Sequence, residues 1–312
     1  MAKVSIVTPC YDAEKYVGKA IESVRAQTFT NWEHILIDDG STDNSTQVIA
    51  SYTKIEPRLR LIRQSNGGVC NARNNGFKEC FPQSQYLLFF DADDYLEPQM
   101  LEVIVKYLDQ HPHVGVAYGD YWHIDEDDRI LPRNPYRRYI PFGFGIRELL
   151  YETPETPLVA VGSGAAVVME SGSVLRRCIY EKTSGWDEWL GQGGEGIDLF
   201  LQFALFSEIH FIPKKLYKYR QYPTQSHRLI DDQLQARKLI AKWKEGKWLT
   251  QEQKLKVAQV LWFYEKRLMP LFEMQSGTDL MRRGQVGTAL RLYLEAGKKY
   301  FMSFFRHHFK ID

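Results

Sequence analysis

Residues 86–94 read Tyr-Leu-Leu-Phe-Phe-Asp-Ala-Asp-Asp, so an apolar run leads directly into three carboxylates within four positions. This pattern is typical of a buried strand that ends by delivering acidic groups to a cleft. Closely spaced carboxylate oxygens suit Mg²⁺ or Mn²⁺, and such an ion commonly shares its ligand shell with substrate phosphates. The alternative is that Asp93 or Asp94 only caps a helix that begins near Pro98. The segments on either side of the run decide between these interpretations.

The segments around this run alternate between strand and helix patterns. The predicted strands cover residues 4–8, 34–37, 59–63, 86–91 and 114–118. Apolar residues at helical spacing predict helices over 15–27, 69–80 and 98–110, with another around 48–52. Such alternation predicts right-handed crossovers and a parallel sheet, so we expect residues 1–120 to form an α/β half.

In open α/β sheets the ligand lies beyond the carboxyl ends of the strands. The residues predicted there combine an aromatic ring, carboxylates and a glycine-rich segment, and they are residues 8–11, 38–39, 64–68 and 91–94. This set matches a nucleoside diphosphate, because a base can stack on Tyr11, Asp39 can accept a hydrogen bond from base or ribose, and a metal on Asp93 can bridge two phosphates. Taken singly, Asp39 also fits a polar turn and Tyr11 a half-buried surface ring.

Four motifs occur in order along this half, at residues 4–11, 37–43, 66–74 and 91–94. The series closely resembles that of the family 2 glycosyltransferases, which are GT-A fold enzymes that use nucleotide sugars and invert the anomeric centre. The resemblance extends from about Lys3 to about Arg220. It implies an α/β, Rossmann-like GT-A domain over residues 1–228, with a mostly parallel sheet flanked by helices. Its nucleotide-binding half would cover about 1–120 and its acceptor half about 121–228.

The same resemblance implies roles for individual residues. Tyr11 would stack on the base, commonly uracil, while Asp39 hydrogen-bonds it and Arg73 lies close to it. Asp91 would contact the ribose, and Asp93 would ligate Mn²⁺ or Mg²⁺ on the diphosphate. The full set of implied nucleotide-sugar contacts is Thr8, Pro9, Tyr11, Asp39, Asn66, Arg73, Asp91, Ala92 and Asp93, and the implied metal ligands are Asp93, Asp91 and His227.

Two positions depart from the family pattern. The family usually has Glu-Asp where this chain has Glu195-Gly196, and that Asp is the general base that deprotonates the acceptor hydroxyl. We expect Glu195 or Asp198 to take this role, unless both only favour the N-terminus of their helix through its dipole. If the base has been lost, replacing Gly196 with aspartate should raise transfer. The second departure is Tyr222, where the family often places a histidine near the metal. His227 either substitutes for it or is an ordinary loop histidine.

Composition and charge bear on the class of partner and on the compartment. The chain has 312 residues and a formal net charge of +1, so no global field favours nucleic acid. Four cysteines without metal-ligand spacing, and no leader sequence before Lys3, predict a reduced, cytoplasmic protein. No run of about 18 apolar residues predicts a membrane span.

The middle and the C-terminal part carry weaker signals. Residues 120–157 are rich in Tyr, Arg and Pro, which fits acceptor-side loops or an ordered connection with a local core. Trp122, Trp186 and Trp189 are candidates for sugar stacking. Residues 229–312 predict a helical C-terminal region. The aromatic and basic segment 300–310 fits peripheral contact with the inner face of a membrane, or packing against protein.

These features predict transfer of a sugar from a nucleotide sugar, a UDP-sugar by preference, to a glycan, lipid-linked or protein-linked acceptor. One alternative is a catalytically impaired GT-A protein that binds the donor without efficient transfer, which the glycine at position 196 suggests. A nicotinamide-dependent oxidoreductase also fits the strand alternation. It ranks lower because residues 8–13 lack the Gly-x-Gly-x-x-Gly turn.

Overall fold

The computed structural model describes residues 2–131, 170–191, 193–222, 232–247 and 249–263, together with Leu290, Leu294 and Glu295. The described residues fall into two compact units, one ending at Tyr222 and the other beginning at Asp232. The expectations for residues 132–157 of the segment 120–157, for His227 and for residues 300–310 lie outside the described residues.

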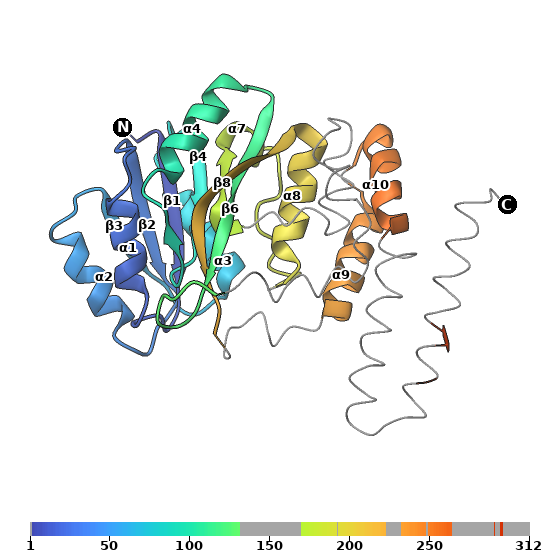
Figure 1. Ribbon diagram of the computed structural model, residues 1–312. Helices are drawn as coiled ribbons and strands as arrows, with labels where there is room; N and C mark the ends of the chain where they lie inside the picture. Colours follow the sequence, from blue (N-terminus) through green and yellow to red (C-terminus); the bar gives the residue numbers. More distant parts are fainter. Residues whose placement is uncertain are drawn as a thin grey trace, which may run out of the picture. The chain divides into compact units, whose positions relative to one another are not determined.

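The first unit is built on a mixed eight-stranded sheet with the strand order β3-β2-β1-β4-β7-β6-β8-β5 (Figure 1). Its parallel half consists of β1 (Val4–Cys10), β2 (Trp32–Asp38), β3 (Leu59–Arg63) and β4 (Tyr86–Phe89). The other half consists of β5 (Tyr95–Leu96), β6 (Val114–Ile124), β7 (Ser173–Arg176) and β8 (Glu208–Arg220). Strand β7 is antiparallel to both β4 and β6, β5 is antiparallel to β8, and β6 is parallel to β8.

The sheet confirms the predicted α/β class, and it departs from a purely parallel sheet beside β4. The predicted strand over residues 59–63 is found with the same bounds, and the strand predicted over 114–118 extends to Ile124 because β8 pairs with it along its length. This strand does not pair with β4, because β7 is inserted between them. A strand of four residues, reading Ser-Val-Leu-Arg, has no periodicity that would distinguish it in the sequence.

Helices cover both faces of the sheet (Figure 1). One layer contains α1 (Val17–Arg25), α2 (Ser45–Thr53) and α4 (Met100–Gln110), and α1 and α4 share one core with side chains of β1 and β4. The other layer contains α3 (Val69–Lys78), α7 (Arg177–Tyr180) and α8 (Glu195–Phe206). Here a Cβ on Gly76 would lie 2.3 Å from Cγ1 of Val7, and the Tyr180 ring lies 4.6 Å from Phe77 and 6.5 Å from Phe203. Glycine at position 76 therefore lets α3 approach β1 closely.

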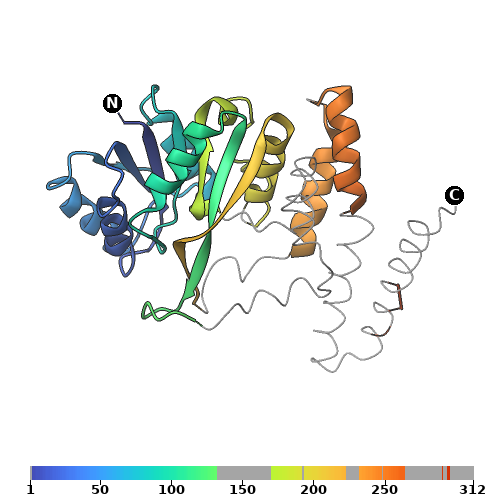
Figure 2. The same ribbon diagram turned by 45° about the horizontal axis from the view of Figure 1, so that its top comes forward.

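The long strands β6 and β8 run side by side (Figure 2). Strand β5 follows the acidic run directly and pairs with β8, with Tyr95 opposite Lys218. The end of β8 therefore lies against the acidic run.

The second unit contains α9 (Asp232–Glu245) and α10 (Gln251–Phe263). A capping box precedes the first turn of α10. The backbone N–H of Gln253 donates to Oγ1 of Thr250 at 3.2 Å, and the Thr250 N–H donates to Oε1 of Gln253 at 3.0 Å, which forms a capping box. None of the helices in the described part of the chain is long and apolar enough to cross a membrane.

Candidate active site

The parallel strands β1, β2, β3 and β4 all end at the same edge of the sheet. The segments that follow β1, β2 and β3 begin with Tyr11, Asp39 and Gln64, and Asp91 comes two residues after the end of β4. The structure therefore brings the four predicted motifs to one edge, where an open α/β sheet binds its ligand.

Asp39 orders the glycine-rich loop that follows β3. Its side chain is 3% exposed and accepts hydrogen bonds from the backbone N–H groups of Gly67 and Gly68 at 2.8 and 2.9 Å, and from Nε2 of Gln64 at 2.7 Å. Asn66, by contrast, is exposed. A Cβ on Gly40, whose φ is +78°, would lie 2.9 Å from the backbone N of Asn66, so the loop packs directly on the Asp39 turn. Asp39 thus holds the glycine-rich loop in place.

Tyr11 remains on the surface, with 52% of its side chain exposed. The next residue, Asp12, has a φ of +47°, and its carboxylate accepts a hydrogen bond from the Thr42 N–H at 2.7 Å, which ties the β1 and β2 loops together. Thr8 is fully buried and hydrogen-bonded to Nε2 of His34 at 2.8 Å, while Pro9 is partly buried. Of these predicted contacts, only Tyr11 presents a free side-chain face.

The three carboxylates of the acidic run have different surroundings. Asp91 is partly exposed and accepts a hydrogen bond from Arg73 at 2.9 Å. Asp93 accepts one from the Tyr222 hydroxyl at 3.0 Å, and burial together with the charge of Asp91 raises the pKa of Asp93 to about 6. Asp94 is fully buried and is hydrogen-bonded by the Tyr217 hydroxyl and the Arg220 N–H.

The alternative that Asp93 or Asp94 caps a helix is wrong, because α4 begins at Met100 and its N-cap residue is Gln99. Ala92, a predicted nucleotide-sugar contact, is buried in a hydrophobic cluster that also contains Cys10. Asp91 and Asp93 are therefore the carboxylates of the acidic run that a ligand could contact. Asp94 instead links the run to β8 through its hydrogen bonds.

Arg220 fixes the backbone of the acidic run. Its side chain is fully buried between the rings of Tyr16 and Tyr95, at 4.4 and 4.8 Å from the ring centroids. It donates to the backbone oxygens of Asp93 and Asp125 at 2.8 and 2.6 Å, and it also bonds Asp128 and Tyr95. Nothing in the local sequence signals this role, because the partners come from distant segments.

Arg73 lies among carboxylates. It is hydrogen-bonded to Asp91, lies 3.6 Å from Oε1 of Glu195, and stacks on the Trp186 ring at 4.2 Å. Burial would favour loss of its proton, but the neighbouring charges of Asp91, Glu195 and Glu170 outweigh this effect and raise the pKa of Arg73. The guanidinium is therefore a permanent cation beside the acidic run.

Neither predicted base has a free carboxylate. Oε2 of Glu195 accepts hydrogen bonds from the N–H groups of Gly193 and Gly194 at 2.6 and 3.0 Å, at the start of α8. Asp198 is fully buried and accepts a hydrogen bond from Gln202 at 2.8 Å. Both contacts fit the structural interpretation, in which these residues stabilise the first turn of α8.

The three tryptophans differ in accessibility. Trp186 is 2% exposed and supports Arg73, so it is not available for stacking on a sugar. Trp189 is 58% exposed, and Trp122 is 36% exposed with Nζ of Lys215 at 4.8 Å from its ring centroid. Trp189 is therefore the most accessible of the three candidates.

Comparisons with known proteins agree with this geometry. Residues 5–167 match the model of the family described as glycosyl transferase family 2. Glycosyltransferase GlyA of Streptococcus pneumoniae is 28% identical over 223 residues, covering 70% of this chain and 30% of the relative. Glycosyltransferase GlyG of the same organism is 34% identical over 126 residues, covering 40% of this chain and 41% of the relative. The chain thus spans less than half the length of these relatives.

Two solved structures share the fold. S. aureus TarS 1-349 in complex with UDP-GlcNAc has a TM-score of 0.64 and 18% identity, covering 96% of this chain and 79% of that one. The mannosyltransferase PcManGT from Pyrobaculum calidifontis, in complex with GDP-Man and Mn²⁺, has a TM-score of 0.61 and 15% identity, covering 96% of this chain and 84% of that one. Because the family match covers more than half of the sequence, this protein belongs to glycosyl transferase family 2.

Proposed function

We propose that the protein transfers a sugar from a nucleotide-sugar donor, a UDP-sugar by preference, to a hydroxyl of a glycan, lipid-linked or protein-linked acceptor by a single inverting displacement. The observation that carries this proposal is the gathering of Asp91, Asp93 and Arg73 at the strand ends that also present Tyr11. The likeness to structures that hold UDP-GlcNAc or GDP-Man supports a nucleotide-sugar donor.

The nucleoside would lie between Tyr11 and the loop that Asp39 orders. The exposed ring of Tyr11 offers a face to the base, and the exposed loop at Asn66 offers backbone groups. Asp39 already accepts three hydrogen bonds from the protein, so its main contribution is to hold this loop in place.

The residues fit Mn²⁺ or Mg²⁺. Asp91 and Asp93 supply hard oxygen atoms, and the raised pKa of Asp93 reports a buried carboxylate beside a like charge, an environment that a divalent cation would relieve. Tyr222 takes the position at which the family often has a histidine, and its hydroxyl orients Asp93. When bound, the ion would supply positive charge to the departing diphosphate.

Replacing Asp93 with alanine should weaken metal-dependent nucleotide binding roughly 100-fold or more, because losing one charged ligand of a divalent ion removes a contact worth several kcal/mol. The test is calorimetric titration of UDP and of GDP, with and without Mn²⁺, into wild type and Asp93→Ala. Asp127→Ala is the matched control, since Asp127 is 64% exposed on a turn and pairs with Arg129. If neither nucleotide binds to the wild type under any of these conditions, the proposed function is wrong.

A further inference from the structure

The side chain of Glu170 fills the space beside Gly196. A Cβ at position 196 would lie 1.6 Å from Oε1 and 2.5 Å from Cδ of Glu170, far closer than non-bonded atoms can approach. Gly196 is not among the residues with positive φ, so its backbone conformation does not require glycine. The carboxylate of Glu170 occupies the space that a side chain at position 196 would need, and this explains the glycine.

Position 196 is also where the resemblance to family 2 places an aspartate. A carboxylate is therefore present at this position, but it comes from η2 (Glu170–Gly172) and not from α8. A carboxylate from a distant part of the chain thus lies beside Gly196.

Glu170 belongs to the candidate active site. The next residue, Ser171, accepts a hydrogen bond from the backbone N–H of Asp91 through its hydroxyl at 3.0 Å. Burial, together with the nearby charge of Glu195, raises the pKa of Glu170 to about 7, and Arg73 opposes this shift. Arg73 itself is already engaged by Asp91 and Glu195. Glu170 can therefore exchange a proton near neutral pH, where a general base is most effective.

We propose that Glu170 takes the proton of the acceptor hydroxyl in place of the aspartate that position 196 lacks. This inference rests on the proposed function. The hydroxyl proton moves to a carboxylate oxygen of Glu170 while the acceptor oxygen forms a bond to the anomeric carbon. The bond from that carbon to the diphosphate oxygen breaks, and its electron pair leaves with the nucleoside diphosphate. Glu170 then releases the proton to water.

The two other candidates are less suited to this step. Oε2 of Glu195 is held by two glycine N–H groups, and its other oxygen faces Arg73. Asp198 is fully buried. Glu170, by contrast, is only partly buried.

A reciprocal exchange of the two positions tests this assignment. The variants are Glu170→Gln, Gly196→Asp and the double variant Glu170→Gly/Gly196→Asp, with Glu170→Gly as its reference. Glu181→Gln is a matched control, because Glu181 is half exposed at the end of α7 and pairs with Arg177. Each variant is assayed for UDP binding with Mn²⁺, and for sugar transfer from UDP-GlcNAc and GDP-mannose to water and to an acceptor panel.

We expect Glu170→Gln to bind UDP within about threefold of wild type and to lose on the order of 10²–10⁴-fold in transfer. The double variant should recover at least about tenfold over Glu170→Gly, because the new aspartate then has room. Gly196→Asp alone should not raise activity. Transfer by Glu170→Gln at the wild-type rate, or a gain from Gly196→Asp alone, overturns the inference. A wild type that neither binds UDP or GDP nor transfers sugar overturns the proposed function and this inference with it.

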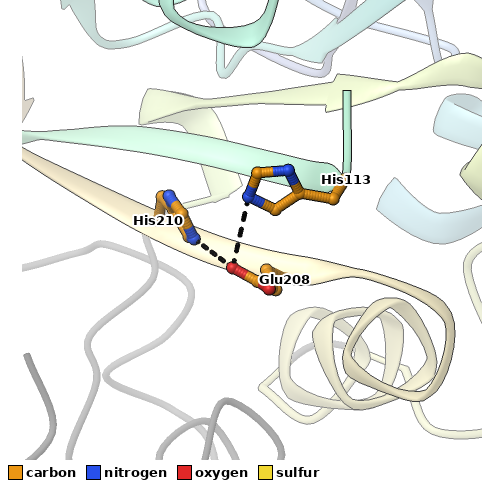
Figure 3. Close-up of side chains that lie close together, drawn as sticks. All are labelled: His113, Glu208 and His210. Carbon is orange, nitrogen blue, oxygen red and sulfur yellow. Dashed lines mark hydrogen bonds and ion pairs between the residues drawn. The ribbon is translucent and has the colours of Figure 1, made fainter. Parts of the chain in front are cut away.

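A second inference comes from a histidine and glutamate cluster at the opposite edge of the sheet, where the parallel strands β6 and β8 begin. One oxygen of Glu208 lies 2.6 Å from Nε2 of His210 and 3.6 Å from Nε2 of His113, and the ligand atoms of all three residues lie within 4.8 Å of one another (Figure 3). Glu208 and His210 are two positions apart on β8, so their side chains share one face.

The cluster has the supporting contacts of a metal site. The Tyr107 hydroxyl is hydrogen-bonded to Nδ1 of His210 at 2.8 Å, which directs Nε2 of His210 toward Glu208. Ligand atoms about 2 Å from a tetrahedral Zn²⁺ are separated by roughly 3.3 Å, so the pair of Glu208 and His210 needs to open by less than about 1 Å. We infer that His113, Glu208 and His210 bind Zn²⁺ or a similar transition metal with an open fourth position.

Zinc titration into the metal-free full chain tests this site. Wild type and Asp93→Ala should each bind one Zn²⁺ here, because Asp93 belongs to the other edge of the sheet. The double variant His113→Gln/His210→Gln should lose this binding, and Tyr107→Phe should weaken it on the order of 10-fold. Cys178→Ser is the control for the exposed cysteine. Zinc binding that the double variant leaves unchanged overturns the inference.

Discussion

Arg73→Met should lower the free energy of unfolding by about 3–5 kcal/mol at pH 8, and by clearly less at pH 5. The Arg73 side chain is only 4% exposed and contacts the carboxylates of Asp91 and Glu195. Removing the guanidinium leaves these carboxylates, with Glu170 nearby, without the cation between them. The cost is large because the charge of Glu195 stays buried when its partner cation is removed.

The pH dependence follows from the direction of the pKa shifts. The pKa of Glu170 is already raised to about 7 by burial and by Glu195, and Arg73 is one of the groups that oppose the rise. A carboxyl group with a folded-state pKa above its unfolded value favours folding most below the unfolded value. That contribution is lost as the pH rises through the folded-state value. Without Arg73 the folded-state pKa of Glu170 rises further, so the variant should lose stability relative to wild type mainly as the pH rises above about 7.

Urea unfolding at pH 5 and pH 8 measures this effect. Arg129→Met is the control, since Arg129 is 76% exposed and pairs with Asp127 on the surface. Surface ion pairs contribute about 0–1 kcal/mol, so the control should change little at either pH. An equal loss for Arg73→Met at both pH values would show that stacking on Trp186, and not charge, accounts for the effect.

The parallel half of the fold could be predicted because its signals are local. Strands β1 to β4 are segments of four to seven residues rich in apolar side chains, and a helix pattern follows each of them in the sequence. Their order along the chain and the right-handed crossover rule then place the four motifs at one edge. Strand β7 could not be predicted, because its position between β4 and β6 depends on pairing with segments far away in the sequence.

The candidate site likewise contains residues that the sequence predicted and residues that it did not. Tyr11 and Asp39 follow β1 and β2 directly, and Asp91 and Asp93 follow β4 within four residues, so the structure places all of them near strand ends. Glu170 was missed because it belongs to no motif. Its only signal in the sequence is indirect, since glycine at position 196 leaves room that some other side chain must fill.

Arg220→Met is the second change with a large expected effect. It should destabilise the fold by about 3 kcal/mol or more, because the lost guanidinium makes four hydrogen bonds in a buried position. It should also abolish metal-dependent UDP binding at temperatures where the protein is still folded. Arg220 donates to the backbone oxygen of Asp93, so its loss frees the segment that carries the proposed metal ligands.

Thermal unfolding and UDP titration with Mn²⁺ separate these two effects. Lys218→Met is the control on the same strand, because Lys218 is 36% exposed and pairs with Glu97 at 3.2 Å. Arg220→Lys should not restore binding, since one ammonium group cannot reproduce a planar fork that reaches Asp93, Asp125 and Asp128 at once. If Arg220→Met is folded and binds UDP as tightly as wild type, the acidic run must hold its shape through Asp94 alone. In that case, UDP binding with Mn²⁺ would be measured on Asp94→Asn, which removes the carboxylate that accepts the Arg220 N–H. Loss of binding would show that the protein preforms the metal site, and unchanged binding would show that the site forms when its ligands bind.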